Sequence, residues 1–363
     1  MSSFATHNQK QEQLNTRKLR QIMKCLPSFC RDFFRGIEHN TSILTRIGYA
    51  YDLRLFFEFL SLEIDGFNGI IPSAITLASI ENIKAVHIEM FLEYLNYYSR
   101  PESPDIEHEN HQSGKARKVS TLRSLISYLF KNGLIGRNVA ELVDMPKIHE
   151  KPVIRLEPDE VATLLDYVES GASLTKHQKN YHKLTRLRDI AILTLFLGTG
   201  VRISECVGLN INDVDFQVNG FRITRKGGNQ TILYFGDEVK NALSDYLDER
   251  KNINPLSGHE EALFLSMQKK RISNRAVQDL VKKYASSAAP LKKISPHKLR
   301  STYGTSLYNE TGDIYLVADV LGHRDVNTTK KHYAAISDTK RRMAAKAVKL
   351  RDSYENSLTD GDR

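Results

Sequence analysis

Apolar residues recur at intervals of three and four along most of the chain, which is the pattern of amphipathic helices. Two clear examples are SILTRIGYAYDLRLFFEFL (42–60) and VSTLRSLISYLFKNGLI (119–135). Gly133 follows the apolar stripe of the second segment and is its predicted C-cap. Polar stretches with proline and glycine at 65–74 and 99–114 predict loops between the helices.

A proline-rich segment divides this pattern in two. MPKIHEKPVIRLEP (145–158) contains three prolines and has no periodicity, so it predicts a linker. A chain of 363 residues is also longer than one hydrophobic core usually needs. We therefore expect a domain over 1–150, a second over 151–350 and a polar tail over 351–363.

The second domain combines helices with one hairpin. EPDEVATLLDYV predicts a helix with Pro158 in its first turn, and the polar insertion ESGASLTKHQKNYHKLT follows it. DIAILTLFLGTGVRISECVGL then predicts an apolar helix, a glycine turn and a short helix that carries Arg202 and Glu205. GFRITR and TILYF flank KGGNQ, which predicts a β-hairpin with Lys226 at its tip. The expected fold is mainly α with a small antiparallel β-sheet.

Helices predicted further along the chain carry polar residues at their ends. Two are expected at 237–250 and 273–288. In SPHKLRSTYG (295–304), His297 and Arg300 are three residues apart, so an imidazole and a permanent guanidinium would project from one helix face.

The last predicted helices follow a glycine. DIYLVADVLGH predicts a helix that Gly322 ends, with His323 just beyond it. TTKKHYAAI places Tyr333 on a further helix, and a C-terminal helix with a short apolar face is expected at 338–350.

Positive charge is concentrated in the second domain. The first 150 residues hold 18 Lys and Arg against 17 Asp and Glu, whereas 151–350 hold 32 against 22, in a chain of formal net charge +9. A surplus confined to one domain indicates a polyanionic partner. A basic surface kept for solubility explains the charge equally well.

Four cations of the first domain crowd the start of the 119–135 helix. Cations at a helix N-terminus oppose the helix dipole, so an anion bound there would relieve the conflict. A solvated charged face is the alternative at this position. The candidates for DNA binding are Lys115, Arg117, Lys118 and Arg123.

The sequence does not indicate a disulfide-rich, zinc-binding, membrane-spanning or secreted protein. Cys25, Cys30 and Cys206 have neither the pattern of a disulfide framework nor the paired spacing of a zinc site, so we expect reduced thiols, no structural metal and a cytoplasmic location. No apolar run approaches the roughly 18 residues of a membrane span. The first twenty residues are polar and unlike a signal peptide.

Four short motifs occur in a defined order: TGVRISE, HKLRSTYGT, VLGHRD and HYA. Taken singly, each polar residue in them has an ordinary structural explanation. Together with the hairpin lysine, they resemble the tyrosine recombinases of the phage integrase and Xer superfamily over about residues 155–345. The long N-terminus and inserted loops look most like the single-protein Xer recombinases of Gram-positive bacteria. The first domain resembles the helical core-binding domain of that family more loosely.

The resemblance implies a two-domain, C-shaped clamp and a site-specific recombinase that cleaves and rejoins DNA through a 3′-phosphotyrosyl intermediate, without a cofactor or a metal. Guanidinium groups suit this chemistry because they hold phosphate oxygens bidentately. A tyrosine of pKa near 10 needs a proton acceptor as it attacks, and the 5′ oxygen must be protonated to leave. The implied roles are Tyr333 as nucleophile, Arg202 and Arg300 as phosphate clamp, Lys226 as acid, His297 and His323 completing the site, and Glu205 supporting Arg202.

The resemblance also implies double-stranded DNA with paired recombination sites as the partner, and a homotetramer joined through the helix at 338–350. Two other functions share the motifs: a DNA-binding relative that has lost catalysis, and a type IB topoisomerase that relaxes DNA as a monomer. Two positions depart from the usual pattern. Ser301 stands where many relatives have a second histidine, and the interval between His323 and Tyr333 is one residue longer than usual.

Overall fold

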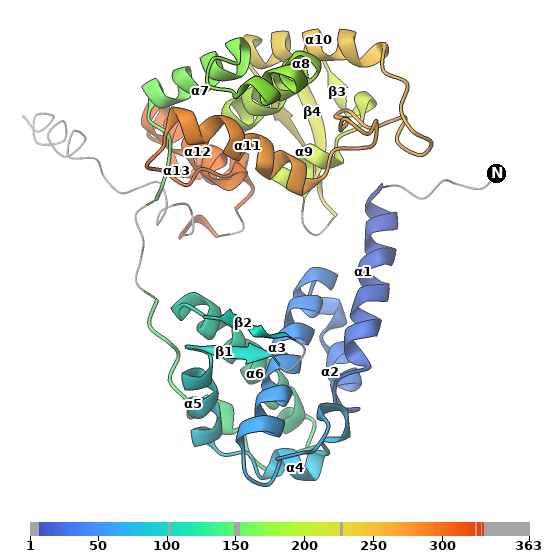
Figure 1. Cartoon of the computed structure of the whole chain (residues 1–363), viewed down its shortest axis with the longest axis vertical. Helices are drawn as coiled ribbons and strands as arrows, with labels where there is room; N and C mark the ends of the chain where they lie inside the picture. Colours follow the sequence, from blue (N-terminus) through green and yellow to red (C-terminus); the bar gives the residue numbers. More distant parts are fainter. Residues whose placement is uncertain are drawn as a thin grey trace, which may run out of the picture. The chain divides into compact units, whose positions relative to one another are not determined.

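Contacts along the chain divide it into two compact units, Met1–Lys151 and Pro152–Arg363 (Figure 1). The computed structural model describes residues 7–100, 103–148, 153–225, 228–323, 325–327 and 329. Helices dominate these residues, and their strands form one two-stranded and one three-stranded antiparallel sheet, which agrees with the predicted fold class. No helix in the described ranges is long and apolar enough to cross a membrane.

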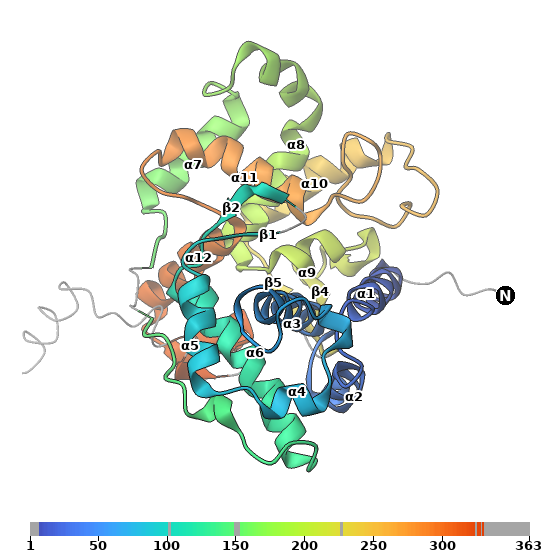
Figure 2. The same cartoon turned by 60° about the horizontal axis from the view of Figure 1, so that its bottom comes forward.

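The first unit is a helical bundle built around α3. Its described elements are α1 (His7–Met23), α2 (Cys30–Gly36), α3 (Ile43–Glu63), α4 (Leu77–Glu81), α5 (Ala85–Tyr94), β1 (Tyr98–Arg100), β2 (Ser103–His108) and α6 (Gln112–Lys131), with short 3-10 turns at Glu38–Asn40, Pro72–Ala74 and Val139–Glu141. α3 contacts both α1 and α6 and runs between them (Figure 2). Its core is rich in aromatic side chains, including Phe33, Phe56, Phe57, Phe59 and Phe91.

The two helices predicted most clearly in this unit are present. Ser42 caps α3 by accepting a hydrogen bond from the backbone N–H of Thr45 at 3.2 Å. α6 begins at Gln112, earlier than the apolar pattern indicates, because its first two turns are polar. Gly133 lies just beyond α6 with a φ of +67°, in the left-handed region that favours glycine.

The predicted loop at 99–114 was wrong in part. β1 and β2 pair as an antiparallel hairpin, with Tyr98 opposite His108 and Ser99 opposite Glu107. The remainder of the range contains the start of α6. The hairpin was missed because β2 is polar and mostly exposed, so its sequence lacks the apolar alternation by which a strand is recognised.

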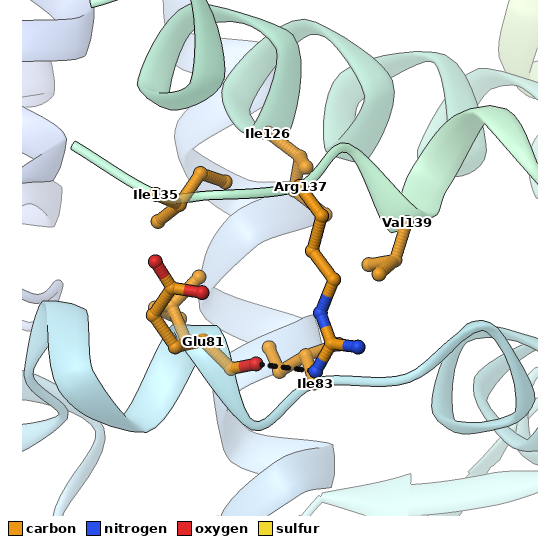
Figure 3. Close-up of a pocket in the computed structure, with 7 residues that line it drawn as sticks. Glu81, Ile83, Ile126, Ile135, Arg137 and Val139 are labelled. Atoms are coloured by element: carbon orange, nitrogen blue, oxygen red, sulfur yellow. Dashed lines mark hydrogen bonds between the residues drawn. The ribbon is translucent and has the colours of Figure 1, made fainter. Parts of the chain in front are cut away.

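A small pocket of the first unit lies between α4, α6 and the segment that follows α6 (Figure 3). Its walls are mainly isoleucine and valine side chains. Arg137 crosses it and donates from Nη2 to the carbonyl oxygen of Glu81 at 3.1 Å. The backbone N–H of Gly136 donates to a carboxylate oxygen of the same glutamate at 2.7 Å. These contacts tie the segment after α6 to the end of α4.

The second unit surrounds α8, which contacts α7, α10 and α12. Its described elements are α7 (Pro158–Ser170), α8 (Lys176–Thr199), α9 (Ile203–Gly208), β3 (Val214–Asp215), β4 (Gly220–Thr224), β5 (Gln230–Tyr234), α10 (Asp237–Lys251), α11 (Asn274–Ala288), α12 (Pro296–Thr311) and α13 (Ile314–Leu321), with a 3-10 turn at Ile211–Asp213. β4 lies between β3 and β5, and both pairings are antiparallel. Phe221 and Leu233 face each other across β4 and β5 and are buried.

α8 begins inside the predicted polar insertion. Thr175 accepts a hydrogen bond from the backbone N–H of Gln178 at 3.3 Å, and the Gln178 side chain accepts one from Thr175 at 3.0 Å. This reciprocal capping box starts a helix in a segment without an apolar stripe. α8 ends at Gly200, whose φ of +61° turns the chain toward α9.

The three cysteines are free thiols in different surroundings. Cys25 is exposed, whereas Cys30 and Cys206 are buried. Burial raises the pKa of both buried thiols, because the thiolate would lose its hydration.

Candidate active site

Arg202 lies at the start of α9, in the turn that Gly200 creates. A Cβ atom on Gly200 would lie 2.4 Å from the ring of Tyr303, so this turn requires glycine for space as well as for its backbone angle. Glu205, one turn into α9, accepts a hydrogen bond from the backbone N–H of Arg202 and another from its guanidinium Nη1, both at 2.9 Å. The carboxylate therefore fixes both the backbone and the side chain of Arg202.

Arg300 lies in the second turn of α12 and is buried, with 4% of its surface exposed. Its Nη1 donates to the carbonyl oxygen of Gly200 and its Nη2 to that of Leu321. His297 lies in the first turn of the same helix and is exposed. The predicted helical spacing is present, with the guanidinium packed inward and the imidazole nearer to solvent.

His323 follows α13, where Gly322 adopts a φ of +61° and ends the helix. The backbone N–H of His323 donates to the carbonyl oxygen of Ala318 at 2.9 Å. Its ring Nδ1 lies 2.7 Å from the hydroxyl oxygen of Thr329, which is fully buried. Thr329 was not predicted from the sequence, where it is one of two adjacent threonines without a distinguishing pattern.

Three predicted site residues meet at the C-terminal end of α13. We call the segment 319–322 the α13 terminus. Arg202 donates from Nη2 to the carbonyl oxygen of Gly322 at 2.9 Å, Arg300 reaches the preceding carbonyl, and His323 is the next residue along the chain. Glu205 joins this group through Arg202. Residues distant in sequence are thus brought together on α9, α12 and the end of α13.

Sequence reasoning did not single out a third arginine at this point. Arg225 follows β4 and donates to the carbonyl oxygens of Asp319 and Val320 at 3.0 and 2.8 Å. The alternation along β4 contained a signal, because Ile223 is buried and Thr224 is exposed, so the next side chain turns inward.

The remaining predictions fall elsewhere. Lys226 and Tyr333 lie outside the described residues. So do the part beyond residue 329 of the helix predicted to carry Tyr333 and the whole helix predicted at 338–350. Within the described ranges, no three His, Cys, Asp or Glu side chains form a group that could hold a metal ion.

The four cations predicted to crowd a helix start instead lie between the first turn and the middle of α6, because this helix begins at Gln112. All four have protein partners. Lys115 and Lys118 are buried and donate to the side-chain oxygens of Asn96 and Asn110. Burial lowers the pKa of Lys118, against the opposite influence of Asp52.

Two arginines of this group differ in exposure. Arg117 pairs with the buried carboxylate of Asp52, although 52% of the arginine side chain is exposed. Burial raises the pKa of Asp52, and Arg117 and Lys118 oppose that rise. Arg123 donates to the carbonyl oxygens of Ala140 and Val143 and so holds the segment after α6.

The sequence matches known recombinases. Residues 155–340 match the Phage integrase family. The chain is 34% identical over 304 residues to tyrosine recombinase XerC of Caldanaerobacter subterraneus subsp. tengcongensis, covering 82% of this chain and 79% of that protein. It is 29% identical over 347 residues to tyrosine recombinase XerS of Streptococcus agalactiae serotype III, covering 88% and 95% of the two chains.

Solved structures share the fold. The XerH site-specific recombinase bound to palindromic difH substrate, in a post-cleavage complex, matches with a TM-score of 0.62 at 19% identity, covering 84% of this chain and 80% of that one. A lambda integrase dimer bound to a COC′ core site matches with a TM-score of 0.54 at 17% identity, covering 82% and 94%.

The fold and these matches define the class of the protein as a tyrosine-type site-specific recombinase, an enzyme that cleaves and rejoins DNA. The chain belongs to the phage integrase family. The resemblance inferred from TGVRISE, HKLRSTYGT, VLGHRD and HYA is thereby confirmed.

Proposed function

We propose that Tyr333 attacks the scissile phosphodiester of duplex DNA and forms a 3′-phosphotyrosyl link, releasing the 5′ oxygen of the broken bond. A second 5′ hydroxyl then attacks the phosphotyrosine, rejoins the strand and frees the tyrosine. The energy of the phosphodiester stays in the covalent link, so the exchange needs no ATP. The observation that carries this proposal is the meeting of Arg202 and Arg300 beside His323 at the α13 terminus.

Arg202 and Arg300 are proposed to hold the scissile phosphate. Attack by tyrosine passes through a pentacoordinate phosphorane with two negative charges, and two planar guanidinium groups can meet its non-bridging oxygens. In the structure both guanidiniums already donate to carbonyl oxygens, so their direction is set before substrate arrives. Preorganised donors of this kind lower the barrier because they need no rearrangement during the reaction.

The proton transfers are assigned to three other side chains. We propose that His297 accepts the phenolic proton of Tyr333 and that Lys226 protonates the departing 5′ oxygen. The exposure of His297 supports this role, because its ring is accessible to a substrate on the surface. His323 is proposed to donate to the phosphate, with its orientation fixed by the 2.7 Å contact between Nδ1 and Thr329.

The partner proposed for this chain is double-stranded DNA with paired recombination sites, bound by a homotetramer joined through residues 338–350. The excess of basic residues in 151–350 supports a polyanionic partner. In the core-binding unit, Arg117 is the best candidate of the four cations at α6, because it remains more than half exposed while paired with Asp52.

Replacing the nucleophile tests this function. Tyr333→Phe keeps the aromatic ring and lacks the attacking oxygen, so it should bind the recombination site normally and form no covalent complex. Denaturing gels of reactions with end-labelled DNA measure the adduct. The wild-type enzyme should form the adduct in excess EDTA as well, because arginines supply the positive charge. A covalent adduct from Tyr333→Phe would overturn the assignment.

A further inference from the structure

The α13 terminus receives an unusual set of hydrogen bonds. A helix ends with four carbonyl groups that lack partners within the helix, and these are usually satisfied by backbone turns or water. Here the carbonyl oxygens of the last three residues of α13 and of Gly322 each accept from an arginine, and that of Asp319 also accepts from the backbone N–H of Gly322 at 2.8 Å. The donors are Arg225 to Asp319 and Val320, Arg300 to Leu321, and Arg202 to Gly322.

Arg225 lies where β4 gives way to the turn that leads to β5, and Lys226 is the next residue in the sequence. Its backbone N–H donates to the carbonyl oxygen of Asn229 at 2.8 Å, and its own carbonyl accepts from the N–H of Gly228 at 3.0 Å. The backbone of Arg225 therefore closes the hairpin at the residue before Lys226. Its side chain reaches another element of the same unit, α13.

Gly322 fits this contact for two reasons. Its φ of +61° is in the left-handed region, which a glycine adopts without strain. A Cβ atom at this position would also lie 1.9 Å from Nη1 of Arg225. Any side chain here would displace the guanidinium, so the end of α13 is shaped around Arg225.

The electrostatic surroundings of Arg225 are mixed. Burial lowers the pKa of its guanidinium, and the nearby cation of Arg202 lowers it further, whereas Glu205 and Asp319 raise it. Cations are favoured at a helix C-terminus because the carbonyls there carry partial negative charge. That partial charge and the carboxylate of Glu205 offset the repulsion between the arginines.

We infer that Arg225 is a positioning residue for strand cleavage, which holds the hairpin end before Lys226 against the α13 terminus that also receives Arg202 and Arg300. The proposed acid and the two arginines proposed to hold the phosphate would then be positioned by the same helix end. This inference rests on the proposed role of Lys226 as the acid. A displacement of about 1 Å at a reacting group can slow a reaction roughly 100-fold, so such an anchor has kinetic consequences.

The test compares two DNA substrates that differ at one atom. In one, the bridging 5′ oxygen at the scissile phosphate is normal; in the other it is sulfur, which leaves without being protonated. Single-turnover cleavage, site binding and thermal unfolding would be measured for Arg225→Ala, Arg225→Lys and Lys226→Ala. Arg222→Ala is the matched control, since Arg222 is an exposed arginine on β4, three residues before Arg225, and its guanidinium pairs with Asp213 at 3.4 Å.

We expect Arg225→Ala to bind the site like the wild type and to cleave the oxygen substrate roughly 10- to 100-fold more slowly. On the sulfur substrate its rate should approach that of the wild type, as the rate of Lys226→Ala should. Arg225→Lys should slow cleavage of the oxygen substrate less than Arg225→Ala does, because its ammonium group can still donate to one of the two carbonyls that the guanidinium spans. Its rate on the sulfur substrate should also approach that of the wild type. Arg222→Ala should match the wild type on both substrates.

A double variant distinguishes the positioning role of Arg225 from the role of Lys226 as the acid, on which it rests. If Arg225 acts through Lys226, Arg225→Ala combined with Lys226→Ala should be no slower on the oxygen substrate than Lys226→Ala alone. If sulfur restored the cleavage rate of Lys226→Ala but of neither Arg225 variant, the inference would be overturned and the acid assignment would stand. The same conclusion would follow if the two rate losses on the oxygen substrate multiplied in the double variant. If sulfur rescues neither residue and the double variant is still no slower, the acid assignment fails and the coupling stands. A purely structural role would lower the unfolding temperature without any difference between substrates.

Discussion

Glu205 shows how one carboxylate can orient an arginine side chain. It accepts from the backbone N–H of Arg202 and from its guanidinium, and its own side chain is only 4% exposed. The remaining guanidinium nitrogen is thereby directed to Gly322. Second contacts of this kind determine how well a phosphate-binding group is placed before the substrate arrives.

Removing this carboxylate should affect cleavage more than binding. We expect Glu205→Ala to bind DNA nearly as well as the wild type and to cleave it roughly tenfold more slowly or worse, because Arg202 loses its fixed direction. Glu205→Gln should lie between the two, since its amide oxygen can serve one of the two donors. Single-turnover cleavage and gel-shift titration measure both effects. Glu310→Gln, an exposed change on α12, is the control, and a wild-type cleavage rate for Glu205→Ala would exclude the orienting role.

At the level of residues, the sequence singled out three side chains that the structure brings together, but it did not predict how they are held. Arg202, Arg300 and His323 could be selected because their motifs occur in a known order. The anchoring role of Arg225 was missed, because an arginine beside a glycine turn resembles an ordinary solvated cation and the alternation along β4 indicates only that its side chain turns inward. Only the tertiary fold brings the carbonyls of 319–322 to it.

Helices were predictable where an apolar stripe or a capping residue marks them. α3 begins after Ser42 as its pattern indicates, and α13 ends at Gly322. The first half of α8 was not predicted, since it is polar on nearly all sides and depends on the capping box at Thr175 and on its junction with an apolar second half. The β1–β2 hairpin has the same limitation, because pairing between two polar strands leaves no periodic signal.

The contact between α3 and α6 gives a prediction at the level of elements. Asp52 on α3 is 3% exposed and accepts from Arg117 and from the buried hydroxyl of Thr121 on α6. Asp52→Ala removes the carboxylate that accepts from both residues, and the Thr121 hydroxyl keeps only the Arg117 carbonyl on its own helix at 3.2 Å. The loss of these hydrogen bonds to a charged group should lower the free energy of unfolding by about 1–3 kcal/mol.

Urea unfolding of the full chain measures this change, and a surface pair provides the control. Asp32 and Arg35 form an ion pair on α2 whose side chains are 57% and 77% exposed. Asp32→Ala should therefore change the free energy of unfolding by less than about 1 kcal/mol. If the two aspartate variants were equally destabilising, Asp52 would not be a structural tie between α3 and α6.

At the scale of the whole molecule, the uneven charge is the feature most relevant to assembly. The second unit holds the basic excess and the α13 terminus, whereas the first 150 residues are nearly neutral. Charge of this kind makes DNA binding strongly dependent on salt but does not by itself join protomers. The homotetramer proposed above would therefore need a separate surface, for which we propose residues 338–350.

Truncation after Ser337 tests that assignment. The shortened chain should bind a single recombination site as the full chain does, because the proposed site residues are all retained. It should fail to pair two sites, since the helix proposed to join protomers is missing. Native gels with one-site and two-site DNA measure binding and pairing separately. Normal pairing by the truncated chain would rule out a joining role for 338–350.

The distribution of the three thiols makes the native sequence suitable for labelling at one position. Alkylating reagents attack the thiolate, which burial disfavours at Cys30 and Cys206, whereas Cys25 is exposed at the end of α1. A maleimide dye should therefore attach to the first unit without any engineered cysteine. A second dye placed on the DNA would then report when this unit arrives at the recombination site and when it leaves.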